Sequence, residues 1–269
     1  MSARRDAWAS VQDFTYRSSG VVLEDERRYL MKSRLERVAL HLGFSSVEEF
    51  VHRACAPGAA PLLTAPLLDA MTTHETSFFR DPSFWKLLGE QILPTLIRGR
   101  NRPLHIWSAA CSSGQEAVSL AITLQERFPA VFAVSKIVAT DVACQTVARA
   151  RTGVYSLLEV NRGLPPERLI RHFEPVPGGF RPVRALRDRI VFMVHNLLGD
   201  PPYPTGFDLV LCRNVLIYFN ESDRGTVLRR LASSATPGYL GLGATELLAG
   251  SSSIGAGWYA LAAGKRGVQ

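Results

Sequence analysis

Two short apolar runs with a helical pattern between them mark the middle of the chain. Residues 104–110 are mostly apolar and read as a strand, and Ser112, Ser113 and Gly114 then allow a sharp turn. A helical pattern begins at 117, and residues 136–141 read as a second strand. The order strand, loop, helix, strand predicts a doubly wound α/β sheet that binds a ligand at the carboxyl ends of its strands.

The later pattern continues this alternation. The expected elements are a buried strand at 190–194, a strand at 207–212, a helix at 223–235, a strand at 239–244 and its hairpin partner at 258–263. Apolar segments on either side of Gly178-Gly179 predict a small antiparallel β insertion at about 172–184. Pro165 and Pro166 exclude one continuous helix in the connection before it.

The beginning of the chain has helical periodicity instead. Apolar residues recur there at steps of four, three and four, at Met31, Leu35, Val38 and Leu42. Ser46 with Glu49 predicts a capping box for a following helix, and residues 62–70 predict another helix. We therefore expect two domains, a helical domain at 1–70 and an α/β domain at 71–269.

Charge adds one candidate surface. The formal net charge is +7, and only four of the 31 basic residues are lysines. The basic residues are scattered along the chain, which permits nucleic-acid binding without indicating it, so no nucleic-acid partner is expected. Arg27, Arg34 and Arg37 fall on one side of the predicted helix and could dock an acidic partner, or they could form an ordinary solvated face.

Cysteines and hydropathy indicate the compartment. The four cysteines form no CxxC pair and three lie in or beside apolar runs, so we expect free thiols rather than disulfides or a metal site. No apolar segment reaches 18 residues, and Arg4-Arg5 is followed by polar residues rather than by the core of a signal peptide. These features predict a cytoplasmic protein without direct membrane insertion.

Two acidic residues restrict the class of ligand that the predicted site could bind. Glu116, near a helix N-terminus, would repel a phosphate but could hold a cationic amino-acid head, and the loop before it has one glycine where a dinucleotide fingerprint has three. Asp141 ends its strand where it could accept hydrogen bonds from ribose hydroxyls. S-adenosylmethionine fits this pattern because it has a cationic head, a ribose and no phosphate. The alternative is two ordinary acids at helix starts.

Four segments together resemble the chemotaxis receptor methyltransferases of the CheR family. They are residues 71–82, residues 107–116, Asn196-Leu197 and residues 212–219, and their order and spacing match the family over most of the chain. The resemblance implies a Rossmann-like class I S-adenosylmethionine-dependent methyltransferase sheet with a small all-α N-terminal domain. It also implies methyl esterification of glutamates on the acidic helices of a chemoreceptor-like protein, with S-adenosylhomocysteine as the product.

The resemblance further implies site residues. Cofactor contacts are implied for His74, Thr76, Arg80, Glu116, Asp141, Asn196, Leu197, Arg213 and Asn214. Arg80 and Tyr218 are implied to be catalytic, and physically they could align a substrate carboxylate through hydrogen bonds. His74 departs from the asparagine that is usual in the family at that place.

Two other functions stay open. His74 leaves room for a non-catalytic module that binds or senses S-adenosylmethionine or S-adenosylhomocysteine. Asp200-Pro-Pro-Tyr203 is similar to the signature of amino-group methyltransferases that act on adenine. In those enzymes the signature follows the fourth strand, whereas here it precedes the 207–212 strand, with Tyr203 in the preceding loop. Methylation of nucleic acids is therefore disfavoured.

Overall fold

A seven-stranded sheet organises the larger part of the molecule. The computed structural model describes residues 6–100, 102–202, 206–235 and 237–261, and Tyr203 lies outside them. The strand order is β5-β2-β1-β6-β7-β9-β8. The strands are β1 His105–Ala109, β2 Lys136–Asp141, β5 Ile190–Val194, β6 Leu209–Cys212, β7 Gly238–Leu242, β8 Ser253–Gly255 and β9 Trp258–Leu261. This sheet confirms the predicted α/β fold class.

The strand directions create a crevice. Strands β5, β2, β1, β6 and β7 are parallel, while β9 pairs antiparallel with both β7 and β8. The chain builds outward from β1 to β2 and β5 on one side, and to β6 and β7 on the other. Such a reversal of strand order opens a crevice at the carboxyl ends of the two central strands.

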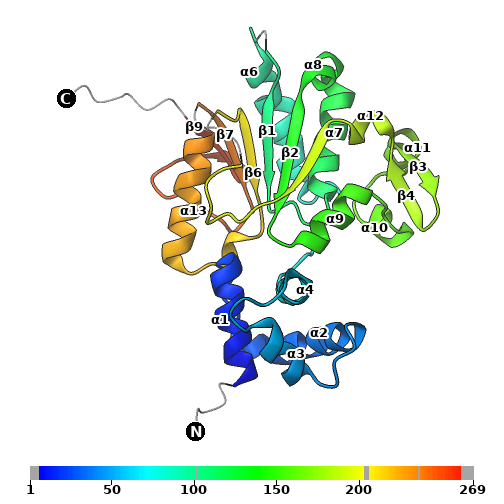
Figure 1. Cartoon of the computed structure of the whole chain (residues 1–269). Coiled ribbons are helices and arrows are strands. Elements are labelled where there is room, and N and C mark those ends of the chain that lie inside the picture. The colour runs from blue at the N-terminus through cyan, green and yellow to red at the C-terminus, as the bar shows by residue number, and fades with distance from the viewer. Residues whose placement is uncertain (1–5, 101, 203–205, 236, 262–269) are drawn as a thin grey trace.

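Helices cover both faces of the sheet (Figure 1). The helices that follow residue 81 are α5 Pro82–Leu87, α6 Leu93–Ile97, α7 Gln115–Arg127, α8 Pro129–Val134, α9 Cys144–Thr152, α10 Leu157–Asn161, α11 Pro166–His172, α12 Arg184–Arg187 and α13 Glu221–Ser234. Short helical turns of other types are η1 Asp25–Arg27, η2 Leu88–Ile92 and η3 Leu216–Tyr218.

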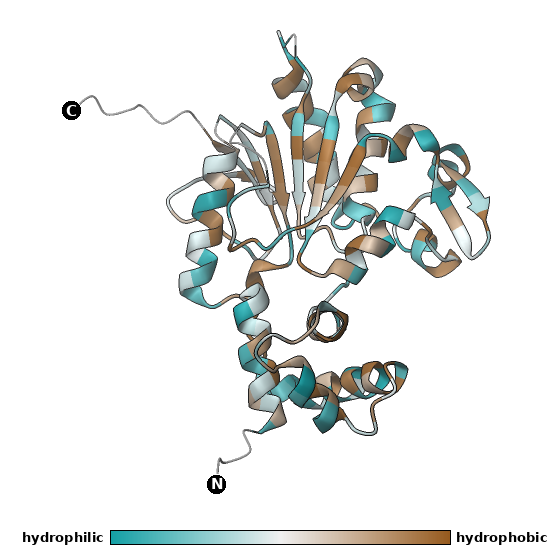
Figure 2. Ribbon diagram, in the orientation of Figure 1, coloured by the Kyte–Doolittle hydropathy of each residue, from teal (hydrophilic) through white to brown (hydrophobic). Residues whose placement is uncertain are grey.

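Side chains of the central strands alternate between two cores. Ile106 and Leu209 belong to the core that also contains apolar residues of α5 and α7, whereas Trp107 and Val210 belong to the core that α13 completes. Figure 2 shows hydrophobic stretches in the central strands of the sheet, together with hydrophilic segments. Burial on both faces explains why they read as continuous apolar runs in the sequence.

Four helices form a separate apolar core at the N-terminal end: α1 Ala7–Ser19, α2 Arg28–His41, α3 Val47–Ala54 and α4 Pro61–Met71. Figure 1 shows them at one end of the molecule, with the C-terminal end of α1 reaching the sheet-containing part. There Val21 forms a β-bridge with Phe219, and the Tyr16 hydroxyl donates to Asp223 at 2.9 Å. Helix α1 was not among the predicted elements.

The predicted β insertion is present, as β3 Phe173–Val176 paired antiparallel with β4 Gly179–Pro182. The prediction of a buried strand at 190–194 was wrong in one respect. Among the described residues β5 pairs with β2 alone and is an edge strand, and Val191 and Val194 are 39% and 50% exposed. The predicted capping box at Ser46 is half formed, because the Glu49 amide donates to Ser46 but the Glu49 carboxylate accepts from Ser45.

Two further expectations concern thiols and membranes. All four cysteines are free, as predicted, and Cys111 and Cys212 are buried. Within the described ranges, no helix has the length and hydropathy needed to cross a membrane.

Candidate functional site

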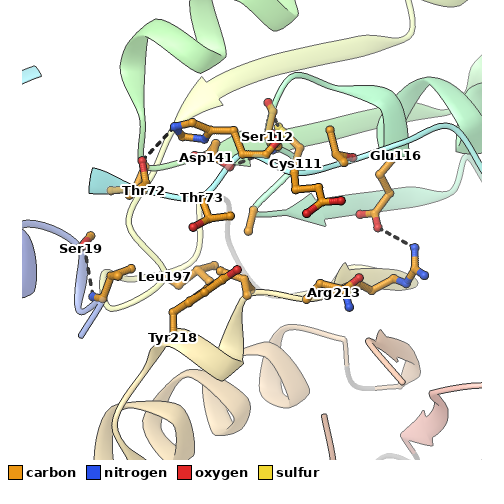
Figure 3. A pocket seen from close by; sticks show the side chains of 18 of the residues that line it. Ser19, Thr72, Thr73, Cys111, Ser112, Glu116, Asp141, Leu197, Arg213 and Tyr218 are labelled. Carbon is orange, nitrogen blue, oxygen red and sulfur yellow. Dashed lines mark hydrogen bonds and ion pairs between the residues drawn. The ribbon is translucent and has the colours of Figure 1, made fainter. Parts of the chain in front are cut away.

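One cavity gathers every site residue that the sequence indicated. It lies at the carboxyl ends of β1, β2, β5 and β6, and the loop after α4 closes one side. The indicated residues in its lining are His74, Thr76, Arg80, Glu116, Asp141, Asn196, Leu197, Arg213, Asn214 and Tyr218. Figure 3 shows Leu197 and Tyr218 across the cavity from Ser112 and Asp141.

The loop after β1 forms one wall and is fixed by Asp141. Ala110, Ser112 and Gly114 have φ values of 57°, 50° and 96°, so the turn is tight and lies in the left-handed region. The Asp141 carboxylate accepts from the Ser112 amide at 2.8 Å and from the Ala143 amide at 3.1 Å. Burial raises the pKa of Asp141, against the lowering effect of these amides. Its oxygens keep further acceptor capacity toward the cavity.

Glu116 is a nearly buried acid at the start of α7. Its side chain is 12% exposed, accepts from the Ser108 hydroxyl at 2.7 Å and pairs with the Arg213 guanidinium at 3.2 Å. Burial raises the pKa of Glu116, and the attraction of Arg213 only partly offsets this. The carboxylate is therefore an anion with an incomplete set of partners, and a cationic group in the cavity would stabilise it.

Arg213 connects two walls of the cavity. Its side chain is 3% exposed, and besides Glu116 it contacts the Asp81 carboxylate at 2.6 Å and donates to the Arg80 carbonyl at 3.0 Å. The guanidinium also lies over the Phe84 ring, 4.0 Å from its centroid. The resemblance implied a cofactor contact for Arg213, and the structure adds a second task, which is to hold the turn that carries Arg80.

The loop after α4 brings His74, Thr76 and Arg80 to the cavity. Nε2 of His74 lies 3.0 Å from both the Thr72 hydroxyl oxygen and the Asp69 carbonyl oxygen. A carbonyl oxygen can only accept, so Nε2 carries a proton. The His74 carbonyl accepts from the Ser112 hydroxyl at 2.9 Å, which ties this loop to the loop after β1.

Asn196 and Asn214 help to shape the cavity through the backbone. The side-chain amide of Asn196 donates through Nδ2 to the Ser18 carbonyl at 2.9 Å, and its Oδ1 accepts from the Leu198 backbone N–H at 2.9 Å. These bonds connect the segment after β5 to α1. Asn214 follows β6 with a φ of 59°. Asparagine adopts this left-handed conformation more readily than most residues.

Glu246 is a residue to which the sequence assigned no role. It is 5% exposed, and its carboxylate accepts from four backbone amides at 2.7–2.9 Å. The donors are Gly243, Asn214, Val215 and Leu216. These bonds fix the segment that leads from β6 to Tyr218. An acid shortly after β7 was the available signal, but three of its four partners lie about thirty residues earlier in the chain and no spacing rule connects them.

Several other lining residues were not anticipated as site residues. Ser19 is the last residue of α1, Val21 follows that helix, and Ser112 and His195 follow β1 and β5. The Nδ1 atom of His195 is buried without a hydrogen-bond partner among the described residues. Among those same residues, no cluster of three histidines, cysteines or acids could hold a metal ion.

A groove adjoins the cavity on the side of α2 and α4. Arg34, Arg37 and His41 line it, and it shares residues 72–75 with the cavity. Arg34 donates to the Ala70 and Thr72 carbonyls at 3.3 and 3.1 Å, whereas Arg37 is exposed. Arg27, expected on the same helix, lies in η1 before it, pairs with Glu24 and sits over the Tyr218 ring.

Comparison with known proteins identifies both parts of the chain. Residues 6–72 match the family model described as the CheR methyltransferase all-alpha domain, and residues 74–255 match the CheR methyltransferase SAM binding domain.

Curated relatives agree with these matches. The chain is 38% identical to chemotaxis protein methyltransferase 1 of Pseudomonas aeruginosa over 255 residues, covering 92% of each chain. It is 39% identical to a chemotaxis protein methyltransferase of Vibrio parahaemolyticus, covering 86% of this chain and 85% of the relative. It is 38% identical to chemotaxis protein methyltransferase Cher2 of Pseudomonas putida, covering 88% of each.

Proposed function

The chain belongs to the CheR methyltransferase family, and we propose that it methylates glutamate side-chain carboxylates on the acidic signalling helices of a chemoreceptor-like protein. The products would be glutamate methyl esters and S-adenosylhomocysteine. Membership of the family makes it an S-adenosylmethionine-dependent methyltransferase of the chemotaxis type. The glutamate substrate and the roles of individual residues are the finer part of the proposal.

The side chains that line the cavity fit S-adenosylmethionine. A buried carboxylate at Glu116 suits the ammonium group of the amino-acid head, and Asp141 has acceptor capacity left for ribose hydroxyls. Leu197 supplies a buried apolar surface beside Asn196, which suits an adenine ring. The proposed cofactor-binding set is completed by His74, Thr76, Arg80, Arg213 and Asn214.

The proposed chemistry requires alignment rather than proton transfer. The cofactor supplies a methyl group on a sulfonium, which is activated for transfer to a nucleophile. A glutamate side chain is already ionised at neutral pH, so the enzyme needs no general base. Arg80 can hold the carboxylate by two parallel hydrogen bonds, and the Tyr218 hydroxyl can position one oxygen. The carrying observation is that both side chains line the same cavity as Glu116 and Asp141.

The groove beside α2 is the proposed docking surface for the acidic helix. It adjoins the cavity and shares the lining residues 72–75 with it, and Arg37 has an exposed guanidinium on this groove. We also propose that residues 1–70 and 71–269 are separate domains and that the enzyme acts in the cytoplasm. The separate apolar core of α1 to α4 and the four free cysteines support these two statements.

Methyl incorporation from radiolabelled S-adenosylmethionine tests the proposal. The purified chain should label a receptor signalling fragment that carries glutamates, and the label should be released by mild base, as expected of an ester. Replacing those glutamates by alanine should abolish the incorporation of label. Arg80→Ala should lower kcat/KM by about a hundredfold, because the carboxylate would lose its guide.

Other outcomes favour the rival functions. Binding of S-adenosylhomocysteine without incorporation into any acidic helical protein would indicate a non-catalytic module. Incorporation into DNA or RNA, with a steep dependence on salt, would indicate nucleic-acid methylation.

A further inference from the structure

Asp81 stands at a place where an aspartate ordinarily caps a helix, but it does not do so. It precedes Pro82 at the start of α5, and its side chain makes no capping hydrogen bond to that helix. Its backbone has a φ of 61°, in the left-handed region. An aspartate before a helix usually accepts from the second or third amide of that helix. This carboxylate instead meets Arg213, 132 positions later in the chain, at 2.6 Å.

Arg213 therefore lies between two carboxylates. Its side chain is 3% exposed and contacts Asp81 at 2.6 Å and Glu116 at 3.2 Å. Glu116 faces the cavity, whereas Asp81 is 43% exposed and is not among the described residues that line it. Asp81 contacts the Nη2 atom of Arg213 and Glu116 contacts the Nη1 atom, so one guanidinium bridges two carboxylates.

This arrangement creates a problem of charge for the proposed cofactor site. If Glu116 holds the ammonium of the cofactor, one buried carboxylate must serve two cations, the ammonium and Arg213. A guanidinium with no other anionic partner would hold Glu116 firmly and repel a second cation. Asp81 removes the difficulty because it supplies a second negative charge at the other terminal nitrogen of Arg213.

We propose that Asp81 is a positioning residue for cofactor binding, which draws the Arg213 guanidinium away from Glu116 and so leaves the Glu116 carboxylate available to the ammonium group of the cofactor. The inference rests on the proposed role of Glu116. Under this proposal Asp81, which does not line the cavity, affects the binding of the amino-acid end of the cofactor. The adenosine end, which meets Asp141 and Leu197, is unaffected.

Calorimetric titration with two ligands tests this assignment. One ligand is S-adenosylhomocysteine, and the other is its analogue that lacks the amino group and keeps the carboxylate. In Asp81→Asn, the asparagine still accepts from Arg213 and tolerates a positive φ, so the substitution removes charge with little change of shape. We expect S-adenosylhomocysteine to bind about tenfold more weakly to Asp81→Asn than to the unsubstituted chain, which corresponds to about 1.4 kcal/mol. The analogue should bind both proteins equally.

Asp188→Asn is the matched control. It removes the same charge from an exposed aspartate that pairs with Arg184 at 3.3 Å, and it should leave both affinities unchanged. Equal weakening of both ligands by Asp81→Asn would show that Asp81 merely supports the loop and would overturn the proposal. Unchanged or tighter binding of S-adenosylhomocysteine would also overturn it. If the unsubstituted chain did not bind S-adenosylhomocysteine, the cofactor site itself would be wrong, and the role of Asp81 with it.

Discussion

Glu116 is the residue whose ionisation should report directly on cofactor binding. Burial raises the pKa of its carboxyl above the ordinary value of 4.5. A raised pKa means that the folded chain binds this proton more tightly than the unfolded chain does, so ionising Glu116 costs stability as the pH rises. A cation beside the carboxylate reverses that preference. Cofactor binding and loss of this proton are therefore linked.

We predict that the affinity for S-adenosylhomocysteine increases from about pH 5 toward pH 7 and then levels off. One linked proton limits the change to at most about tenfold per pH unit. Titration calorimetry over this range would measure it, with Glu116→Gln as the comparison. The variant should bind more weakly at neutral pH and should have a much flatter profile. An equally steep profile in the variant would assign the linkage to another group, such as Asp141, whose pKa is also raised by burial.

The sequence indicated ten residues that share one cavity, but it did not predict the side chains and backbone amides that these residues contact. All ten indicated side chains line one cavity because each lies at or after the end of a strand or in the loop after α4, and the topology of the sheet brings these places together. The Asp81–Arg213 pair was not predicted, since the two residues are far apart in the chain and aspartate before proline has an ordinary explanation as a helix cap. The role of Glu246 was not predicted either, because its partners are backbone amides and three of the four lie about thirty residues earlier.

The junction between α1 and the sheet-containing part offers a test at the scale of elements. Gly20 ends α1 with a φ of 78°, and a Cβ atom there would lie 2.5 Å from Leu198 and 2.8 Å from Phe219. Gly43 follows α2 with a φ of 77° and nothing within 4 Å of the same position. Both glycines avoid the same backbone strain, but only Gly20 also permits close packing.

We predict that Gly43→Ala lowers the free energy of unfolding by about 1 kcal/mol, the cost of a left-handed alanine. Gly20→Ala should lower it by about 1–3 kcal/mol more, because the added methyl group has no room. Denaturant titrations of the two variants and of the unsubstituted chain would measure both values. Equal decreases in the free energy of unfolding would mean that Leu198 and Phe219 can move to accept the methyl group, and that α1 is not tightly packed at this junction.

Elements with strong patterns were predictable from the sequence, and weakly amphipathic ones were not. The strand at 136–141 agrees with β2 residue for residue, because residues 137–141 are buried on both faces and Ile137, Val138 and Ala139 form a short apolar run. Helix α1 was missed although Trp8, Val11, Thr15 and Ser19 are buried at steps of three, four and four. Half of that buried stripe is polar, so hydropathy alone does not reveal it.

At the scale of the whole molecule, the proposed sites for the substrate helix and for the cofactor are built from different parts of the chain. The cavity is built mostly from loops at the edge of the sheet, whereas the adjoining groove is built from α2, α4 and the loop after α4. Arg34 cannot be tested simply for docking, because it donates to the Ala70 and Thr72 carbonyls and supports the wall between the two hollows. Arg37 is exposed on the same groove and is the better probe.

Arg37→Glu should weaken the productive encounter with an acidic helix without disturbing the cavity. Reversal of one exposed charge at a docking surface acts mainly on association, so we predict a KM for the receptor fragment that is about three- to tenfold higher at low salt, with kcat unchanged. The difference should shrink as salt is raised, because exposed charges are screened. The affinity for S-adenosylhomocysteine should not change. Arg229→Glu, on the exposed face of α13, makes the same change of charge away from the groove and should leave KM as it was. Equal effects of the two variants would mean that the enzyme responds only to net charge, and the acidic helix would then need another docking surface.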